Sequence, residues 1–286
     1  MKIVKMSKQD HHTIGEVYLS PFSFTYKDGP EQIYVLEKGM DRTARKNIRS
    51  FMAPPNQFDL QFFSATEKGV FEDLNGKVET HYPKVLAGLK GSNQLNKENE
   101  FILKQFVSNL LCRTSNMRKI IQSAYDNPAK RDAFLNEISM YTKPELKGAS
   151  LVGSIPAEDR LNFLSLLVMR HLTFVFEHFS CVIIREYDKR GWITCDNPVV
   201  VDYNGVIDYL IPIETEIYFP LSPEYCLYMH HPNSEIKTNE LRKLPNGRVC
   251  DASESVQEMI FAKIRDNVDK YVIFPWNLGV VDLSKL

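Results

Sequence analysis

The chain has 286 residues, of which 43% are hydrophobic and 25% charged, and its formal net charge is −1. This is ordinary globular composition, and the length permits a sizeable core. The near-neutral charge excludes a global basic field of the kind that drives non-specific nucleic-acid binding, although a local basic patch stays open.

The five cysteines are scattered and form no CxxC or CxxH pair. We therefore expect buried structural thiols rather than a zinc site or a nucleophile. The first residues lack the apolar stretch of a signal peptide, and the apolar runs fall short of the roughly 20 residues that cross a bilayer. These features favour a reduced, cytoplasmic chain without a membrane partner.

The N-terminal region predicts an apolar insertion followed by a hairpin. The apolar residues within 18–22 should enter the core from a short helix or extended segment, since Pro21 discourages a longer helix. Residues 33–37 predict a strand, and 44–51 are its expected partner. The basic residues of this hairpin form either a solvated face or a phosphate contact. They are Lys38, Arg42, Arg45, Lys46 and Arg49.

Helical spacing of apolar residues dominates the middle of the chain. It predicts helices at residues 71–89, about 97–125, 130–140 and 158–178. Pro83 lies inside the first, so a kink or a helix start is expected near it. Asn96 or Asn99 should cap the second. Residues 141–156 predict a loop or lid. The last helix is apolar around most of its circumference and should be central.

Short strands follow residue 179. They are predicted at residues 181–187, 192–195, 199–203, 206–212, 216–220, 225–230 and 271–274, with a helix at 254–269. A turn at 188–191 predicts that the first two form a hairpin. This order indicates an α+β fold: central helices with a mainly antiparallel sheet, a short N-terminal hairpin and a C-terminal helix. We expect one domain over residues 1–286, helical at about 70–178 and sheet-forming at about 179–286.

The helix predicted at about 97–125 carries a polar row. Gln105, Asn109 and Arg113 recur every four residues and share one helix face, which either meets water or lines an interior site. In a site, Arg113 would hold a carboxylate or phosphate through its bidentate guanidinium. Arg118 is expected at the surface.

Two further clusters flank this helix in the sequence. Asp196 and Asn197 follow an apolar strand, where the carboxylate is a metal ligand, a general base or an arginine partner, or else caps a turn. Of His11 and His12 at most one enters a given site, and a solvated terminus is the alternative. The sequence contains no GxSxG, P-loop, GxGxxG or zinc pattern.

The remaining histidines give weaker signals. His171 and His178 are seven residues apart, rather than at the i, i+4 spacing of a metal-binding pair, which favours core or interface positions. His230 and His231 are expected at the surface.

Four stretches occur in the order of a known family. Residues 12–22 match an opening His-Tyr-Val-Pro-x-x-Tyr-Leu-x-x-Phe pattern, and residues 101–118 a Phe-Ile-x-x-Gln helix that ends in Arg-Thr-Pro-x-x-Arg. Residues 192–199 match a strand ending in Ser-Asp-Asn-Pro-Val, and residues 219–223 a later Pro-Leu-Ser-Pro. In these motifs the chain resembles the "domain of unknown function 4238" family over roughly residues 10–276.

The resemblance selects His12 rather than its neighbour and implies that five side chains meet in space. The other four are Gln105, Arg113, Asp196 and Asn197. The chain departs from the pattern where Gly15 and Ser115 replace proline and Cys195 replaces serine, which weakens the case for a rigid entry turn. The family implies no activity, since it is named for having none assigned.

Two functional hypotheses follow. In the first, the chain is a metal-assisted or histidine-assisted phosphodiesterase or nuclease-like hydrolase acting on a nucleic acid or nucleotide. Such an enzyme could serve a bacterial defence or toxin system. His12 is then the general acid/base, Asp196 a ligand of a divalent metal or the orienter of His12, and Arg113 the group that stabilises phosphate charge. The substrate-positioning residues are Gln105, Asn109 and Asn197.

In the second hypothesis, the chain is a ligand-sensing or interaction module without catalysis. The same residues then form a structural network, with an Arg113–Asp196 ion pair and with His12 tying down the terminus. A structural network should be sealed and fully paired, whereas a catalytic one should open onto a cleft and leave donors or acceptors free.

Overall fold

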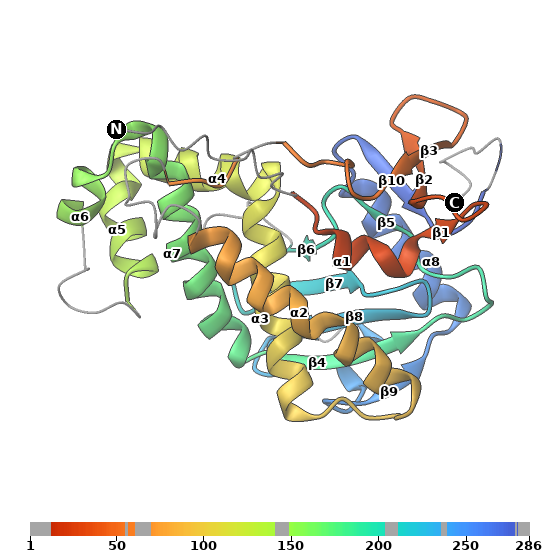
Figure 1. The fold of residues 1–286 in the computed structure, drawn as a ribbon. Helices are drawn as coiled ribbons and strands as arrows, with labels where there is room; N and C mark the ends of the chain where they lie inside the picture. Colours follow the sequence, from red (N-terminus) through yellow and green to blue (C-terminus); the bar gives the residue numbers. More distant parts are fainter. Residues whose placement is uncertain are drawn as a thin grey trace.

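The computed structural model describes residues 13–54, 57–60, 70–140, 149–203, 211–235, 239–277 and 279. Its α-helices are α1 (Glu16–Leu19), α2 (Val70–Lys90), α3 (Lys97–Arg113), α4 (Ser115–Asp126), α5 (Pro128–Ile138), α6 (Ala149–Ser154), α7 (Ala157–Glu177) and α8 (Glu254–Asp266). Its strands are β1 (Phe24–Thr25), β2 (Glu31–Glu37), β3 (Ala44–Asn47), β4 (Ser180–Arg185), β5 (Thr194–Cys195), β6 (Val200–Asp202), β7 (Glu216–Pro220), β8 (Tyr225–His230), β9 (Val249–Asp251) and β10 (Tyr271–Phe274). This confirms the α+β fold (Figure 1).

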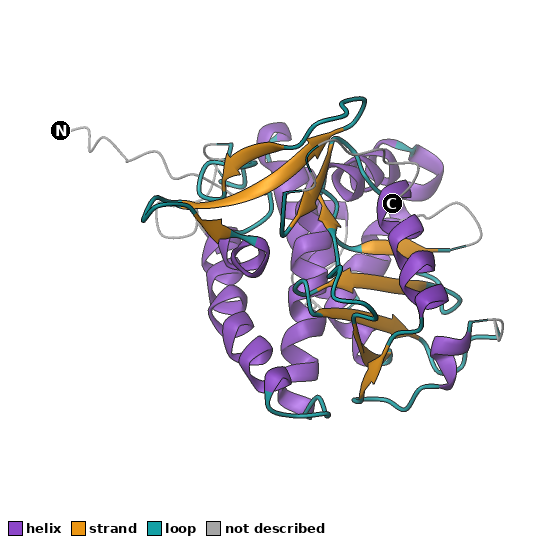
Figure 2. Cartoon of the chain, turned by 90° about the vertical axis from the view of Figure 1, so that its right-hand side faces the viewer, coloured by secondary structure: helices purple, strands orange, loops and turns teal. Residues whose placement is uncertain are grey.

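The strands form two sheets, which Figure 2 shows as separate layers. One has the order β6-β7-β8-β4-β9 and is antiparallel except where β9 runs parallel to β4. The other has the order β1-β2-β10-β5, with β3 also paired to β2. Strand β10 lies between β2 and β5, so a strand late in the sequence joins the N-terminal hairpin to β5.

Both faces of the β6-β7-β8-β4-β9 sheet are covered. Alternate residues of β4 enter two different cores, with Cys181 and Ile183 on the side of α3 and α7, and Val182 and Ile184 on the side of α8. A strand that is buried on both faces reads as a continuous apolar run. This is why β4 and β8 were predictable as strands although their apolar residues do not alternate with polar ones.

Most predicted elements occur close to their expected positions. The N-terminal insertion is confirmed, since Tyr18, Leu19 and Phe22 are fully buried. The helix expected at 158–178 is α7, which contacts α3, α4 and α5 and is therefore central. None of the helices in the described ranges is long and apolar enough to cross a membrane.

Some of the predicted elements lie partly outside the residues that the structure describes. Residues 204–210, which cover most of the strand expected at 206–212, lie outside the described residues, as do 141–148 of the expected loop or lid. The described remainder of that loop contains α6. The extent of the single domain stays a prediction.

The prediction of one helix over 97–125 is wrong, because α3 ends at Arg113 and α4 begins at Ser115. Thr114 between them has an extended backbone, with φ −69° and ψ 148°. Its hydroxyl donates to the Leu111 carbonyl at 2.8 Å and accepts from the Met117 amide at 3.3 Å. One side chain therefore closes the first helix and caps the second, while the apolar spacing continues across the break.

The expected hairpin over 181–195 is also wrong. Strand β4 pairs with β8 and β9, whereas β5 pairs with β10. The chain leaves the sheet after β4 through Lys189 and Gly191, which have φ of 61° and 67°, and the Trp192 amide then bonds the Pro223 carbonyl at 2.7 Å. Helix α2, in contrast, continues through Pro83 without a new start.

Candidate functional site

A cavity of about 310 Å³ lies at the junction of α3 and α4. We call it the arginine pocket. It is lined by Thr13, Met52, Gln57, Arg113, Ser115, Arg118, Asp196 and Asp269. The fold thus brings together two of the residues predicted from the sequence, Arg113 and Asp196, from distant parts of the chain.

The break between the two helices places both arginines at this pocket. Arg113 is the last residue of α3, and Arg118 lies near the start of α4. Their guanidinium carbons lie 5.5 and 5.4 Å from the centroid of the buried Phe58 ring. One aromatic ring therefore supports two positive groups, an arrangement that cation–π attraction stabilises. The expectation that Arg118 lies at the surface is wrong, since only part of this side chain is exposed.

Each arginine leaves one buried nitrogen unpaired. Arg113 Nη1 pairs with Glu79 Oε1 at 2.7 Å, and Arg118 Nη2 donates to Asn162 Oδ1 at 2.9 Å. Arg113 Nε and Arg118 Nη1 are buried and have no hydrogen-bond partner among the described residues. Burial lowers the pKa of Arg118, because the charged form loses solvation. Unpaired buried donors cost free energy, so this pocket is suited to an anion that supplies acceptor oxygens.

Asp196 lines the same pocket, but its carboxylate is engaged with the backbone. Its Oδ1 accepts from the Asp269 amide at 3.0 Å, and its Oδ2 from the amides of Lys270 and Tyr271 at 2.6 and 2.9 Å. These bonds fix the turn between α8 and β10. Burial raises the pKa of Asp196, and the three backbone bonds act against that rise. The carboxylate is placed as a turn cap, and Arg113 forms its ion pair with Glu79 instead.

The other predicted site residues lie elsewhere. Gln105 and Asn109 line a separate cavity between α2, α3 and α7. Asn197 lines a third cavity, where its Nδ2 donates to the Asn267 carbonyl at 3.2 Å and Asn267 Nδ2 donates to the Asn197 carbonyl at 2.6 Å. These residues therefore do not share the arginine pocket.

His12 lies outside the described residues. Its neighbour Thr13 lines the arginine pocket and is held there, since its amide donates to the Met52 carbonyl at 2.9 Å and its hydroxyl to Gln57 Oε1 at 3.3 Å. Position 12 is therefore one residue from the pocket wall along the chain.

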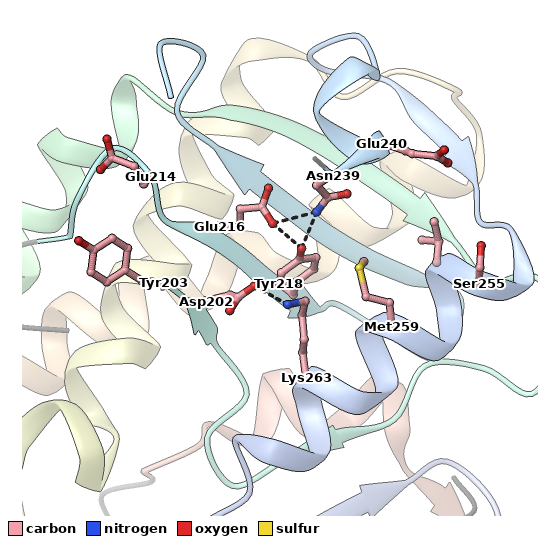
Figure 3. Close-up of a pocket in the computed structure, with 11 residues that line it drawn as sticks. Asp202, Tyr203, Glu214, Glu216, Tyr218, Asn239, Glu240, Ser255, Met259 and Lys263 are labelled. Carbon is pink, nitrogen blue, oxygen red and sulfur yellow. Dashed lines mark hydrogen bonds and ion pairs between the residues drawn. The ribbon is translucent and has the colours of Figure 1, made fainter. Parts of the chain in front are cut away.

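A second cluster of buried charge was not singled out from the sequence. Glu216 accepts hydrogen bonds from the hydroxyls of Tyr218 and Tyr228, from Asn239 Nδ2 at 2.8 Å and from Arg242 Nε at 2.5 Å. We call these five residues the Glu216 cluster. It borders a cavity of about 440 Å³, shown in Figure 3.

The pairing in the Glu216 cluster is complete for its carboxylate. Burial alone would raise the pKa of Glu216, but the hydrogen bonds from Asn239, Arg242, Tyr228 and Tyr218 outweigh burial and lower it. Beside it, Lys263 and Asp202, which line the same cavity, form an ion pair (Figure 3). The sequence signal that could have indicated this cluster is Glu216 itself, a glutamate at the start of an otherwise apolar strand.

The remaining candidates show ordinary environments, but the expectation that His230 lies at the surface is wrong, because this side chain is buried. His171 is 2% exposed, and burial lowers its pKa despite Glu137 at 3.8 Å. In the basic hairpin, the Arg45 guanidinium lies 5.0 Å from the Tyr26 ring centroid. The five cysteines are free, and all but Cys250 are buried. Within the described ranges, no group of three or more His, Cys, Asp or Glu side chains could hold a metal ion.

The comparisons with known proteins give one match. A family model described as "Protein of unknown function (DUF4238)" covers residues 10–274, which include every residue that lines the arginine pocket. No curated protein and no solved structure matches the chain.

Proposed function

We propose that this chain, which belongs to the DUF4238 family, binds a phosphate group of a nucleotide or nucleic acid in the arginine pocket. We propose further that the protein is a phosphodiesterase or nuclease-like hydrolase whose reaction takes place in this pocket. The supporting observation is the pair of buried, unpaired nitrogens, Arg113 Nε and Arg118 Nη1. A phosphodiester offers two non-bridging oxygens that accept charge-assisted hydrogen bonds from such donors.

The two carboxylates that line the pocket do not pair with the unpaired arginine nitrogens, which are therefore available to a ligand. Asp196 already accepts three backbone hydrogen bonds. Asp269 is exposed and accepts from Ser115 Oγ at 3.0 Å. Both acidic groups therefore have partners of their own, and the unpaired atoms in the lining are donors.

The catalytic part of the proposal assigns the acid/base role to His12, the residue before Thr13. A histidine titrates near neutral pH, so it can take and return a proton during phosphodiester cleavage. Arg113 and Arg118 would stabilise the charge that develops on the phosphate oxygens. Arg118 is thus added to the site, although it was not among the site residues predicted from the sequence. We place this activity in the cytoplasm, because reduced thiols persist there and all five cysteines are free.

A cleavage assay tests the proposal. Bis(4-nitrophenyl) phosphate and single-stranded RNA and DNA oligonucleotides are incubated with the protein, with and without magnesium. We expect turnover that falls by about 100-fold or more in His12→Ala and in Arg118→Leu. Arg185→Leu is the control, since Arg185 pairs with Asp251 outside the pocket and should keep full activity. Absence of cleavage of all three substrates would overturn the hydrolase proposal.

One observation favours the non-catalytic alternative. The Asp196 carboxylate holds a turn, so it is not free to serve as a base. A ligand sensor would bind phosphate-bearing molecules through the same arginines without turnover. In that case His12→Ala would leave the affinity unchanged, so measuring binding and turnover on one preparation separates the two functions.

A further inference from the structure

The largest of the cavities named above, about 680 Å³, lies between α2, α3 and α7. Helix α3 contacts both of the other helices, and residues of all three helices line the cavity. We call it the helical groove. Its volume is in the range of small-molecule sites.

The walls of the helical groove are mainly apolar and include aromatic side chains from two helices. Leu74 of α2 and Phe101 of α3 are 38% and 42% exposed. Phe174 of α7 lines the same cavity. Large apolar side chains at a concave surface favour a ligand with a flat or apolar body.

A buried amide lies in the wall of this cavity. Asn109 lines the groove and is 1% exposed. Its Nδ2 donates to Asn75 Oδ1, which fixes the amide, and its Oδ1 is buried with no hydrogen-bond partner among the described residues. Gln105, one turn earlier on the same face, presents a second amide to the groove. A ligand with an N–H or O–H donor could satisfy the unpaired Asn109 oxygen, which an apolar chain could not do.

The rim of the groove is more positive than negative. Lys77 and Arg170 carry positive charge, and Glu177 is the acidic residue of the lining. These cations favour a ligand with an anionic substituent. The Asn109 acceptor and the aromatic walls together favour a heteroaromatic ring with an N–H donor.

We propose that the helical groove binds a purine nucleotide, with the base against the aromatic and apolar walls and an N–H of the base edge donating to Asn109 Oδ1. The phosphate is held by the cations of the rim. This site is separate from the arginine pocket, and the inference does not depend on the hydrolase function.

Calorimetric titration with adenosine 5′-monophosphate and with adenosine tests this site. The nucleotide should bind, and adenosine should bind more weakly because it lacks the phosphate. Phe101→Ala should weaken nucleotide binding by about fivefold or more, the effect of losing one base-stacking contact. Asn109→Leu should also weaken it by about fivefold or more, because it removes the acceptor. Tyr187→Ala, which removes an aromatic side chain that is 53% exposed and lies outside the groove, should bind as the wild type does.

Arg118→Leu separates this site from the arginine pocket. That variant should lose phosphate binding at the arginine pocket, whereas the nucleotide binding that Phe101→Ala weakens should stay within about twofold of the wild type. The proposal is overturned if the nucleotide does not bind at millimolar concentration or if Phe101→Ala binds it as tightly as the wild type. It is also overturned if Arg118→Leu abolishes binding, which would place the nucleotide in the arginine pocket. Because Phe101 is exposed, its truncation keeps the test valid even if Asn109→Leu fails to fold.

Discussion

The arginine pocket and the Glu216 cluster both bury charged groups, but they differ in how completely those groups are paired. In the Glu216 cluster the carboxylate receives hydrogen bonds from two tyrosines, Asn239 and Arg242. In the arginine pocket Arg113 Nε and Arg118 Nη1 lack a partner among the described residues. Buried charge alone therefore does not identify a ligand site in this molecule, whereas incomplete pairing beside a cavity does.

The difference also concerns what each cluster holds together. The Glu216 cluster links β7 and β8 to the 3-10 turn that begins at Glu240. The arginine pocket joins the α3–α4 junction to Thr13 and to the turn that Asp196 caps. Disruption of the first should cost mainly stability, and disruption of the guanidinium pair in the second should cost mainly binding.

The largest expected effect is on the stability of the Glu216 cluster. Arg242→Leu would leave a buried carboxylate without its cation, since both side chains of the pair are only 9% exposed. We expect the free energy of unfolding to fall by about 3–5 kcal/mol, measured by urea denaturation. Arg185→Leu, which breaks an exposed pair, should cost about 1 kcal/mol or less. Equal losses in the two variants would contradict the structural role of the cluster.

The next effect concerns Asp196. Asp196→Ala removes the acceptor of three backbone amides at the α8–β10 turn, so we expect a loss of about 2–4 kcal/mol in the free energy of unfolding. Urea denaturation of this variant checks the value. A variant of unchanged stability that has lost all turnover would instead assign the carboxylate a catalytic role.

Arg118→Leu should have a smaller effect on stability, of about 1 kcal/mol. The variant loses the bond to Asn162 but no longer buries an unpaired guanidinium nitrogen, so the two changes offset each other. Thermal and urea unfolding without ligand measure this. A loss as large as that of Arg242→Leu would show that the arginine pocket is a structural network like the Glu216 cluster.

The pH dependence of stability gives the smallest expected difference. The pKa of Glu216 is lowered in the folded state, so its carboxylate stabilises the fold fully above the ordinary value of 4.5. This contribution is lost as the pH falls below that value towards the folded-state pKa. The stability difference between wild type and Glu216→Gln should therefore shrink on acidification below pH 4.5, by at most about 1.4 kcal/mol per pH unit. A stability difference between the two proteins that does not change with pH would contradict this prediction.

Much of the fold could be predicted because apolar spacing is local information. Helix α7 and strands β7, β8 and β10 follow directly from it. The break at Thr114 could not be predicted from spacing, since one hydroxyl bonds both helices while the apolar pattern continues. The partner of β5 could not be predicted either, because β10 lies far along the chain and the turn before it depends on Asp196.

The site was predictable to a smaller extent. Arg113 and Asp196 were identified from helix periodicity and from the Asp-Asn-Pro turn, and both line the arginine pocket. Arg118 was assigned to the surface because its position depends on the helix break and on Phe58 beneath it. Gln105 shares a helix row with Arg113, but a row that spans two helical turns can border two cavities.

Equilibrium binding of a phosphate-bearing ligand to the arginine pocket is the most direct test of the central claim. Inorganic phosphate and a dinucleotide are titrated calorimetrically into the wild type, Arg118→Leu and Arg185→Leu. The account predicts binding to the wild type and to Arg185→Leu, and a loss of about tenfold or more in Arg118→Leu, as expected for a charge-assisted hydrogen bond. Equal affinity of all three proteins, or no binding to the wild type, would contradict it.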